Sequence, residues 1–265
     1  MRVALAITSW ERPDALAAVL ASVMRQSQAP DEIIIADDGS GAPTRHVIDA
    51  FVRGAGGRAH LVSQPHDGFR VARLRNLAVA KASADYVVFI DGDMLLHREF
   101  LADHVRCARR GYWTQGVRAR ADERLTASLV CQPAGFPAAT ARGLGVLRRA
   151  YLLYSPSWSR LCRRLANGLI ATKACNQGFW REDLVRLNGF NEDIVGWGPE
   201  DKELCARAGH AGIRRQTLLF GGITCHLHHP AAARDRLPAN LAILEATRRE
   251  RRVRCEHGLD SHTGS

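Results

Sequence analysis

Two pairs of acidic residues are the most informative feature of this chain of 265 residues. Asp91 and Asp93 follow an apolar run, and Glu200 and Asp201 stand side by side after Gly196-Trp197-Gly198-Pro199. Carboxylate oxygens are ligands that Mg²⁺ and Mn²⁺ prefer, and the glycine between the first two lets phosphates approach the backbone. We therefore predict a metal and phosphate site at the first pair and a general base for a hydroxyl at the second.

The second acidic pair lies at the expected start of a helix, where Glu200 and Asp201 point in different directions. One can act as a base while the other holds the acceptor, and Trp197 can stack on the apolar face of a ring. Burial raises the pKa of a carboxyl and a helix N-terminus lowers it, and the residue types leave open which effect wins. The alternative is a capping cluster with Pro199 in the first turn, which needs neither Trp197 nor two glycines.

The first hundred residues alternate strand-like and helix-like patterns. We expect strands at Val3 to Thr8, Glu32 to Ala36, Ala59 to Val62 and Tyr86 to Ile90, with helices beginning at Pro13 and Val71. This order predicts βαβ units and an α/β fold with a mostly parallel central sheet flanked by helices. Because ligands bind beyond the carboxyl ends of such strands, the polar residues after three of them predict one crevice. Those residues are Thr8-Ser9, Asp37-Asp38 and Asp91-Gly92-Asp93.

The polar residues after the first two strands, together with Trp10 and the helix residue Arg75, are candidates for nucleotide contacts. A carboxylate at Asp37-Asp38 can accept a hydrogen bond from a uracil N–H, or it can form an Asx turn before the next helix. Thr8 and Trp10 follow the first strand, where Trp10 either borders the base or anchors the core. Arg75 can reach a phosphate or the aspartates, and its alternative is a solvated helix face.

The run Cys225-His226-Leu227-His228-His229 supplies nitrogen ligands late in the chain. A neutral imidazole is a good additional ligand for Mn²⁺, and three nearby histidines exceed what a core needs. A zinc site is the competing interpretation, but the chain lacks a paired cysteine set.

The chain is basic, with a net charge of +10 and a pI near 9.8. The absence of a nucleic-acid module signature argues against a nucleic-acid partner. A basic amphipathic segment from Leu147 to Arg164 is either a solvated helix pair or a patch that approaches anionic lipid. We expect a helical basic tail from Leu237 to Glu256 and a frayed end from Gly258 to Ser265.

Seven scattered cysteines without a C-x-x-C pair are typical of a reduced cytosolic protein. No apolar run approaches the length of a membrane span, and we interpret the start of the chain as a strand rather than a signal peptide. We therefore expect a cytoplasmic protein that can associate peripherally with the inner face of the cytoplasmic membrane.

Two groups of motifs carry a family resemblance. Ile7-Thr8-Ser9-Trp10-Glu11-Arg12, Asp37-Asp38-Gly39-Ser40, Arg75-Asn76 and Phe89-Ile90-Asp91-Gly92-Asp93 resemble the nucleotide-binding half of family-two glycosyltransferases with the GT-A (Rossmann-like) fold. The later runs are similar to the carboxyl-terminal galactosyltransferase-type domain. They are Asn176-Gln177-Gly178-Phe179-Trp180, Asn188-Gly189-Phe190 and Gly196 to Asp201.

The resemblance implies a role for each matching residue. Asp38, Thr8 and Trp10 would contact the uracil, Arg75 the diphosphate, and Asp91 the donor sugar or the metal. Asp93 and His226 would bind Mn²⁺ or Mg²⁺, with His228 or His229 as alternatives to His226. Asp201 would be the catalytic base, and Glu200, Trp197 and Asn176 would bind the acceptor.

These roles together predict a metal-dependent inverting glycosyltransferase. It would move a sugar (galactose, N-acetylgalactosamine or N-acetylglucosamine) from a UDP-sugar to a glycan or lipid-linked acceptor in bacterial surface polysaccharide or lipopolysaccharide synthesis. Residues 1–110 would form the nucleotide-sugar half, 111–235 the acceptor-binding half and subdomain, and 236–265 a basic helix and tail. Two alternatives are a nucleotidyltransferase, whose glycine-rich loop is missing here, and an inactive glycan-binding relative.

Overall fold

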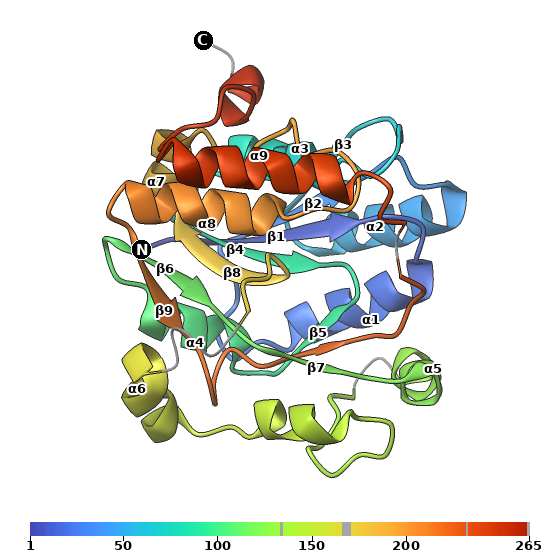
Figure 1. Cartoon of the computed structure of the whole chain (residues 1–265). Helices are drawn as coiled ribbons and strands as arrows, with labels where there is room; N and C mark the ends of the chain where they lie inside the picture. Colours follow the sequence, from blue (N-terminus) through green and yellow to red (C-terminus); the bar gives the residue numbers. More distant parts are fainter. Residues whose placement is uncertain (133–134, 166–170, 232, 264–265) are drawn as a thin grey trace.

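The computed structural model describes residues 1–132, 135–165, 171–231 and 233–263. A seven-stranded sheet runs through the centre in the order β3-β2-β1-β4-β8-β6-β9 (Figure 1). Its strands are β1 (Val3–Ser9), β2 (Glu32–Asp37), β3 (Ala59–Ser63), β4 (Tyr86–Asp91), β6 (Tyr112–Gln115), β8 (Asn176–Trp180) and β9 (Arg214–Thr217). The first four strands are parallel, as expected from the βαβ pattern.

Strand β8 joins the two halves of the sheet. It pairs antiparallel with β4 on one side and with β6 on the other, and β6 then pairs in parallel with β9. A second, three-stranded sheet contains β5 (Met94–Leu96), β10 (Thr224–His226) and β7 (Arg118–Arg120), with β10 in the middle. The mostly parallel sheet is therefore confirmed, with one antiparallel strand, β8, next to the central strand β4.

Helices cover both faces of the large sheet (Figure 1). They are α1 (Pro13–Met24), α2 (Ala42–Gly54), α3 (Val71–Lys81), α4 (Phe100–Cys107), α5 (Glu123–Cys131), α6 (Pro156–Leu165), α7 (Arg181–Leu187), α8 (Glu200–His210) and α9 (Leu237–Arg249). Two 3₁₀ helices, η1 (Val146–Leu152) and η2 (Leu259–His262), complete the described elements.

The core consists of two apolar clusters, one on each face of the sheet. In β1, Leu5 and Ile7 pack with α1 and α4 in one cluster, whereas Ala4 and Ala6 pack with α3, α7 and α8 in the other. Strands buried on both faces read as continuous apolar runs, which explains the composition of β1 and β4.

The end of the chain differs from the expectation. Helix α9 ends at Arg249 rather than near Glu256, and the residues that follow it are not all frayed. Leu259 of η2 is buried in the cluster with α3, and the backbone N–H of Leu259 donates to the carbonyl of Asn188 at 3.0 Å. Short side chains and glycine suggested fraying, but this tertiary contact orders the segment.

Among the residues described, none of the helices combines the length and apolarity that a membrane crossing requires. All seven cysteines are free thiols, as expected from their spacing.

Candidate active site

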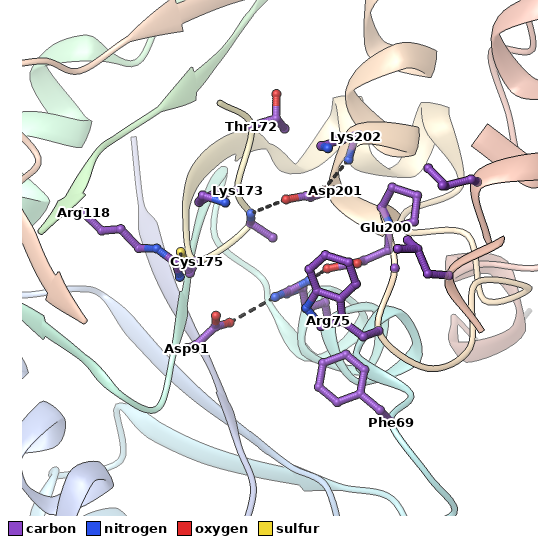
Figure 2. A pocket seen from close by; sticks show the side chains of 16 residues that line it. Phe69, Arg75, Asp91, Arg118, Thr172, Lys173, Cys175, Glu200, Asp201 and Lys202 are labelled. Carbon is purple, nitrogen blue, oxygen red and sulfur yellow. Dashed lines mark hydrogen bonds and ion pairs between the residues drawn. The ribbon is translucent and has the colours of Figure 1, made fainter. Parts of the chain in front are cut away.

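A pocket of about 350 Å³ lies where the carboxyl end of β4 faces the amino end of α8. Its walls bring Asp91 and Arg75 from the first half of the chain together with Trp197, Glu200 and Asp201 from the second (Figure 2). Asp91, the last residue of β4, lines this cavity. This is the position expected for it, because ligands bind beyond the carboxyl ends of parallel strands. The two motifs that the sequence places far apart therefore share one site.

Asp93, His226 and His229 form a second cluster, in which one ligand atom from each residue lies within 4.8 Å of the others. His226 Nε2 is 3.7 Å from Asp93 Oδ1, and His229 Nε2 is 3.3 Å from Asp93 Oδ2. Among the described atoms, Asp93 Oδ1 is buried and accepts no hydrogen bond. A divalent cation would satisfy that oxygen, and this donor set of one carboxylate and two imidazoles fits Mn²⁺. His228 is not part of the cluster.

The charge on Asp93 is balanced by basic neighbours. Burial and the nearby Asp91 raise the pKa of Asp93 to about 6, although His229 and Arg12 oppose the rise. Arg12 Nη1 donates to Asp93 Oδ2 at 2.8 Å, and Arg12 Nη2 donates to the carbonyl of His228 at 2.8 Å. Asp93 is therefore ionised at neutral pH and available as a ligand.

The imidazole of His226 is kept neutral. Burial, helped by the positive charge of Arg118, lowers the pKa of His226 to about 2. A neutral imidazole keeps a lone pair free for a metal ion, which is the state that ligation requires.

Arg75 connects the end of β4 with the start of α8. Arg75 Nη2 donates to Asp91 Oδ1 at 3.0 Å, and Arg75 Nη1 donates to Glu200 Oε1 at 2.7 Å. Thr8 Oγ1 also donates to Asp91 Oδ1, at 3.0 Å. Only 4% of Arg75 is exposed, so the alternative of a solvated helix face is wrong. The contact of Arg75 with the aspartate is confirmed.

Burial dominates the electrostatics of the acidic pair on α8. Burial raises the pKa of Glu200 to about 7. The charge of Asp201 also raises this pKa, and Arg75 opposes the rise. Burial also raises the pKa of Asp201, against Arg75 and two backbone N–H donors. Those donors are Lys202, at 2.7 Å from Oδ1, and Ala174, at 3.1 Å from Oδ2. Of the two effects that the sequence left open, burial is therefore the one that the raised pKa of both carboxyls favours.

The two aspartates after β2 have different roles. Asp37 accepts hydrogen bonds from the N–H of Ser40 at 2.9 Å and from its hydroxyl at 2.6 Å, which is the Asx turn. Asp38 accepts from Gln64 Nε2 at 2.5 Å and lies 2.9 Å from His66 Nδ1. Thus one carboxylate shapes the turn while its neighbour faces the loop after β3.

Trp10 is not a core anchor, because 51% of its surface is exposed. Its ring stacks on His66, with centroids 4.6 Å apart and an interplanar angle of 7°. Because His66 also contacts Asp38, the stacked rings and this carboxylate lie next to each other at the carboxyl ends of the parallel strands. A uracil contact for Asp38 and Trp10 stays a prediction.

Asn176 lies inside the fold rather than on the wall of the pocket. Its side chain is buried on β8, where Nδ2 donates to the carbonyls of Val117 at 2.9 Å and Gly222 at 2.8 Å. Its Oδ1 lies 2.9 Å from His104 Nε2. Both amide N–H groups and one lone pair of Oδ1 are thus used inside the fold, and Asn176 is not among the residues that line the pocket. An acceptor contact for Asn176 stays a prediction.

Trp197 borders the pocket with 37% of its surface exposed and lies beneath Arg234, whose guanidinium carbon is 4.5 Å from the ring centroid. The glycines beside it have structural roles. Gly196 has a φ of +79°, which side chains rarely adopt, and a Cβ on Gly198 would lie 2.6 Å from Asn240 Nδ2. Both glycines therefore hold the loop that presents Trp197.

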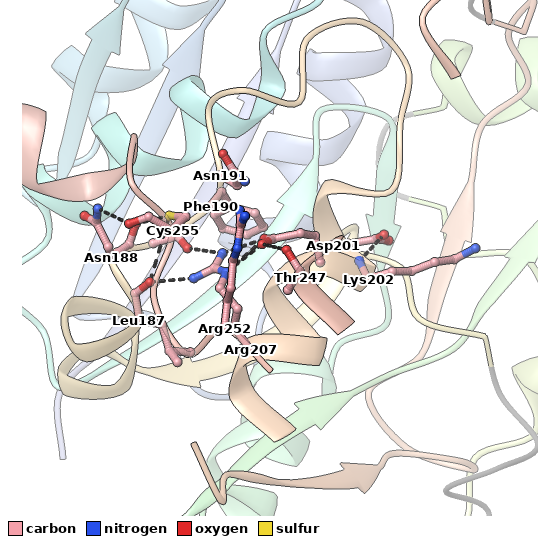
Figure 3. A network of polar contacts seen from close by, with 12 residues as sticks. Leu187, Asn188, Phe190, Asn191, Asp201, Lys202, Arg207, Thr247, Arg252 and Cys255 are labelled. Carbon is pink, nitrogen blue, oxygen red and sulfur yellow. Dashed lines mark hydrogen bonds and ion pairs between the residues drawn. The ribbon is translucent and has the colours of Figure 1, made fainter. Parts of the chain in front are cut away.

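A buried ion pair fixes helix α8 (Figure 3). Glu203 and Arg207, one turn apart on α8, are fully buried, and Arg207 Nη2 donates to Glu203 Oε2 at 2.7 Å. Arg207 Nη2 also donates to the carbonyl of Gly189 at 2.8 Å, and Thr247 Oγ1 of α9 donates to Glu203 Oε1 at 3.0 Å. The acidic pair at the start of α8 is thereby anchored to α9 and to the loop after α7.

Several residues of the site were not singled out from the sequence. Arg12, Gln64, His66, Arg118 and Lys173 lie on strand ends or loops that only the tertiary fold brings to this edge. For His66, the run Pro65-His66-Asp67-Gly68 after β3 was a usable signal, since it also follows a parallel strand.

Two family models match this chain. Residues 5–131 match the model described as glycosyl transferase family 2, and residues 170–230 match the model described as the N-terminal domain of galactosyltransferase. The first match contains Asp91 and Asp93, and the second contains Glu200, Asp201 and His226. The two matched regions thus meet at the pocket.

Among curated proteins, the chain is similar to validoxylamine A glucosyltransferase of Streptomyces hygroscopicus subsp. limoneus. The two are 29% identical over 220 residues, which cover 78% of this chain and 48% of the relative. The chain therefore spans about half the length of that relative.

Solved structures with low sequence identity share the fold. The S. aureus protein TarS has a TM-score of 0.65 and 13% identity over 99% of this chain and 41% of TarS. Its fragment 1–349 in complex with UDP-GlcNAc has a TM-score of 0.58 and 15% identity, covering 87% of this chain and 60% of the fragment. The mannosyltransferase PcManGT from Pyrobaculum calidifontis, in complex with GDP-Man and Mn²⁺, has a TM-score of 0.58 and 18% identity, covering 93% and 69%. The expected GT-A fold is confirmed.

Proposed function

We propose that this chain, which carries a family 2 glycosyltransferase domain at residues 5–131, transfers a hexosyl group from a UDP-sugar to a hydroxyl. The main observation behind this proposal is the buried Arg75, which connects the donor side with the acceptor side. Its Nη2 donates to Asp91 Oδ1 at 3.0 Å, and its Nη1 donates to Glu200 Oε1 at 2.7 Å. A pocket that joins both carboxylates in this way suits a reaction between two bound substrates.

The transfer proceeds with inversion. Asp201 accepts the proton of the acceptor hydroxyl while that oxygen bonds to the anomeric carbon. The bond between this carbon and the β-phosphate oxygen breaks on the opposite face, and UDP leaves with the electron pair. The raised pKa of Asp201 makes it a stronger base than an exposed aspartate.

The remaining residues bind and orient the substrates. Glu200 and Trp197 hold the acceptor, and Asp38, Thr8 and Trp10 contact the uracil. Asp93, His226 and His229 would hold Mn²⁺ or Mg²⁺, which supplies positive charge for the departing diphosphate. The UDP-GlcNAc complex of TarS and the Mn²⁺ complex of PcManGT support a nucleotide-sugar donor and a metal for this fold.

The finer assignment is a galactosyl or N-acetylhexosaminyl transfer in bacterial surface polysaccharide or lipopolysaccharide synthesis. Its test is UDP release from a panel of UDP-sugars, with and without Mn²⁺. Metal-dependent release that favours one sugar would support the class and identify the donor. The absence of release from every UDP-sugar, combined with tighter binding of GDP than of UDP, would refute it.

The base is tested by Asp201→Asn, which should abolish transfer while UDP binding is retained. Asp14→Asn is the matched control, because Asp14 is an exposed acid in the first turn of α1, away from the pocket. Wild-type turnover in Asp201→Asn would mean that another group is the base.

Helix α6 supports a peripheral membrane association on the cytoplasmic face. Trp158 and Leu161 are 61% and 67% exposed, and Arg160 is exposed beside them. Apolar side chains flanked by arginine suit an anionic bilayer surface. The side chains of Arg148 and Arg164, also expected in this segment, lie outside the described residues. The protein should sediment with phosphatidylglycerol vesicles at low salt but not with phosphatidylcholine vesicles, and Trp158→Ser with Leu161→Ser should abolish this. Equal sedimentation of the double variant would exclude α6.

A further inference from the structure

Arg118 and Lys173 differ from Arg12 and Arg75, the paired cations of the candidate site, and from Lys202, which also lines the pocket but is exposed. Arg12 is paired with Asp93, and Arg75 is paired with two carboxylates. Within the described ranges, no ion pair joins Arg118 or Lys173 to any carboxylate, although both line the pocket (Figure 2). Two cations on one wall, without anionic partners, leave positive charge uncompensated.

The scaffold holds both residues in place. Arg118 lies on β7, where its Nη1 donates to Cys175 Sγ at 3.2 Å, and its Nε is buried with no hydrogen-bond partner in the described structure. The backbone of Lys173 is fixed by Gln115, which accepts from its N–H at 3.0 Å and donates to its carbonyl at 3.1 Å. The guanidinium of Arg118 and the backbone of Lys173 are therefore held in place, with side-chain donors left over for a ligand.

The location of the pair indicates which anion it takes. Arg118 of β7 pairs in register with Thr224 of β10, two residues before His226 of the metal-ligand cluster. Lys173 precedes Ala174, whose backbone N–H donates to Asp201 Oδ2 at 3.1 Å. The pair thus lies between the metal-ligand cluster and the acidic pair of α8, where the bond to the leaving group breaks.

We propose that Arg118 and Lys173 form an anion-binding site that takes the diphosphate of the nucleotide donor. This assignment rests on the proposed function. Charge-assisted hydrogen bonds from an arginine and a lysine suit phosphate oxygens, and they strengthen as the diphosphate gains charge on leaving. The same oxyanion chemistry would suit an acidic group on the acceptor, so the experiment must separate the two sources.

The test is calorimetric titration of the full chain with UDP, uridine and inorganic pyrophosphate, in EDTA to remove divalent metal. Arg118→Met and Lys173→Met should each weaken UDP binding by about tenfold or more and leave uridine binding unchanged. Arg118→Lys should retain part of the UDP affinity. The matched controls are Arg124→Met on α5 and Lys81→Met at the end of α3, both exposed. Equal uridine affinity also shows that the variants are folded.

The outcomes separate this proposal from the function it rests on. Unchanged UDP affinity in both variants, or equal losses for UDP and uridine, would overturn the diphosphate assignment. Unchanged UDP affinity with lost pyrophosphate affinity would assign the pair to an acidic acceptor instead. If wild-type protein binds pyrophosphate but not UDP, and the variants bind neither, the anion site is supported and the UDP donor is refuted.

Discussion

Removal of Arg75 should destabilise the protein in a pH-dependent way. Arg75→Met leaves Asp91 and Glu200 without their shared counter-charge. Breaking a buried ion pair by removing one partner costs about 3–5 kcal/mol. Part of this cost disappears when Glu200 takes up a proton, so the penalty should depend on pH around the pKa of Glu200.

The sign follows from the raised pKa. In the folded wild type the pKa of Glu200 is about 7, against 4.5 for an ordinary glutamate, and Arg75 lowers it. Without Arg75 the folded pKa rises further. A group whose folded pKa is raised stabilises the fold at low pH, and this contribution is lost as pH rises through the folded pKa. The wild type loses most of it near pH 7, and the variant continues to lose it above pH 7.

The penalty of Arg75→Met should therefore be roughly 1 kcal/mol larger at pH 8 than at pH 6. Urea unfolding at both pH values in EDTA measures it. Arg73→Met is the control, because Arg73 lies on the same helix and its Nη1 donates to the neutral Gln64 at 2.8 Å. Adding Glu200→Gln to Arg75→Met should remove most of the pH dependence and leave only the smaller part that Asp201 contributes. An equal penalty at both pH values, or a pH dependence as large in the double variant as in Arg75→Met, would refute the reasoning.

Mn²⁺ affinity, measured by calorimetry, should fall by about tenfold or more in His226→Ala, and an unchanged value would exclude this ligand. Wild-type Mn²⁺ affinity should also fall as pH drops through about 6, because Asp93 must be ionised to bind; a flat profile from pH 5 to 8 would contradict this. Arg207→Met should cost about 3–5 kcal/mol in urea unfolding, since it leaves the charge of Glu203 buried without a counter-charge, and a loss below 1 kcal/mol would contradict the proposed anchor. Gly198→Ala should lower the free energy of unfolding by about 1–3 kcal/mol and lower kcat/KM for the acceptor, because the added methyl group meets tightly packed atoms. Unchanged stability and kinetics would show that the loop moves to accommodate the methyl group.

The amino-terminal half of the site could be predicted because its signals are local. Val3 to Ser9 and Tyr86 to Asp91 are apolar on both faces, and each is followed by polar residues where a parallel strand must end. Periodicity and turn residues were sufficient to place Asp91 and Asp93 at one edge. The start of α8 at Glu200 was also predictable from the proline and the acidic residues around it.

The carboxyl-terminal half of the site was less predictable because its contacts are non-local. Asn176 matched a family motif, yet its amide is used to join β8 to the neighbouring loops. Arg118 and Lys173 carry no local pattern and become neighbours only through the small sheet and the end of β8. The pKa values of Glu200 and Asp201 depend on burial, which a pattern of charges does not reveal.

The antiparallel strand β8 has a consequence for synthesis on the ribosome. Strand β4, buried in the finished protein, has β1 on one side and β8 on the other. The partner on the second side lies almost ninety residues later, so at about 5–20 residues per second the apolar edge of β4 waits roughly 4–18 s for it. Exposed strand edges of this kind recruit other chains. The nascent chain therefore depends on a chaperone most when it has emerged only as far as α4. A fragment that ends at α4 should form aggregates when it is expressed.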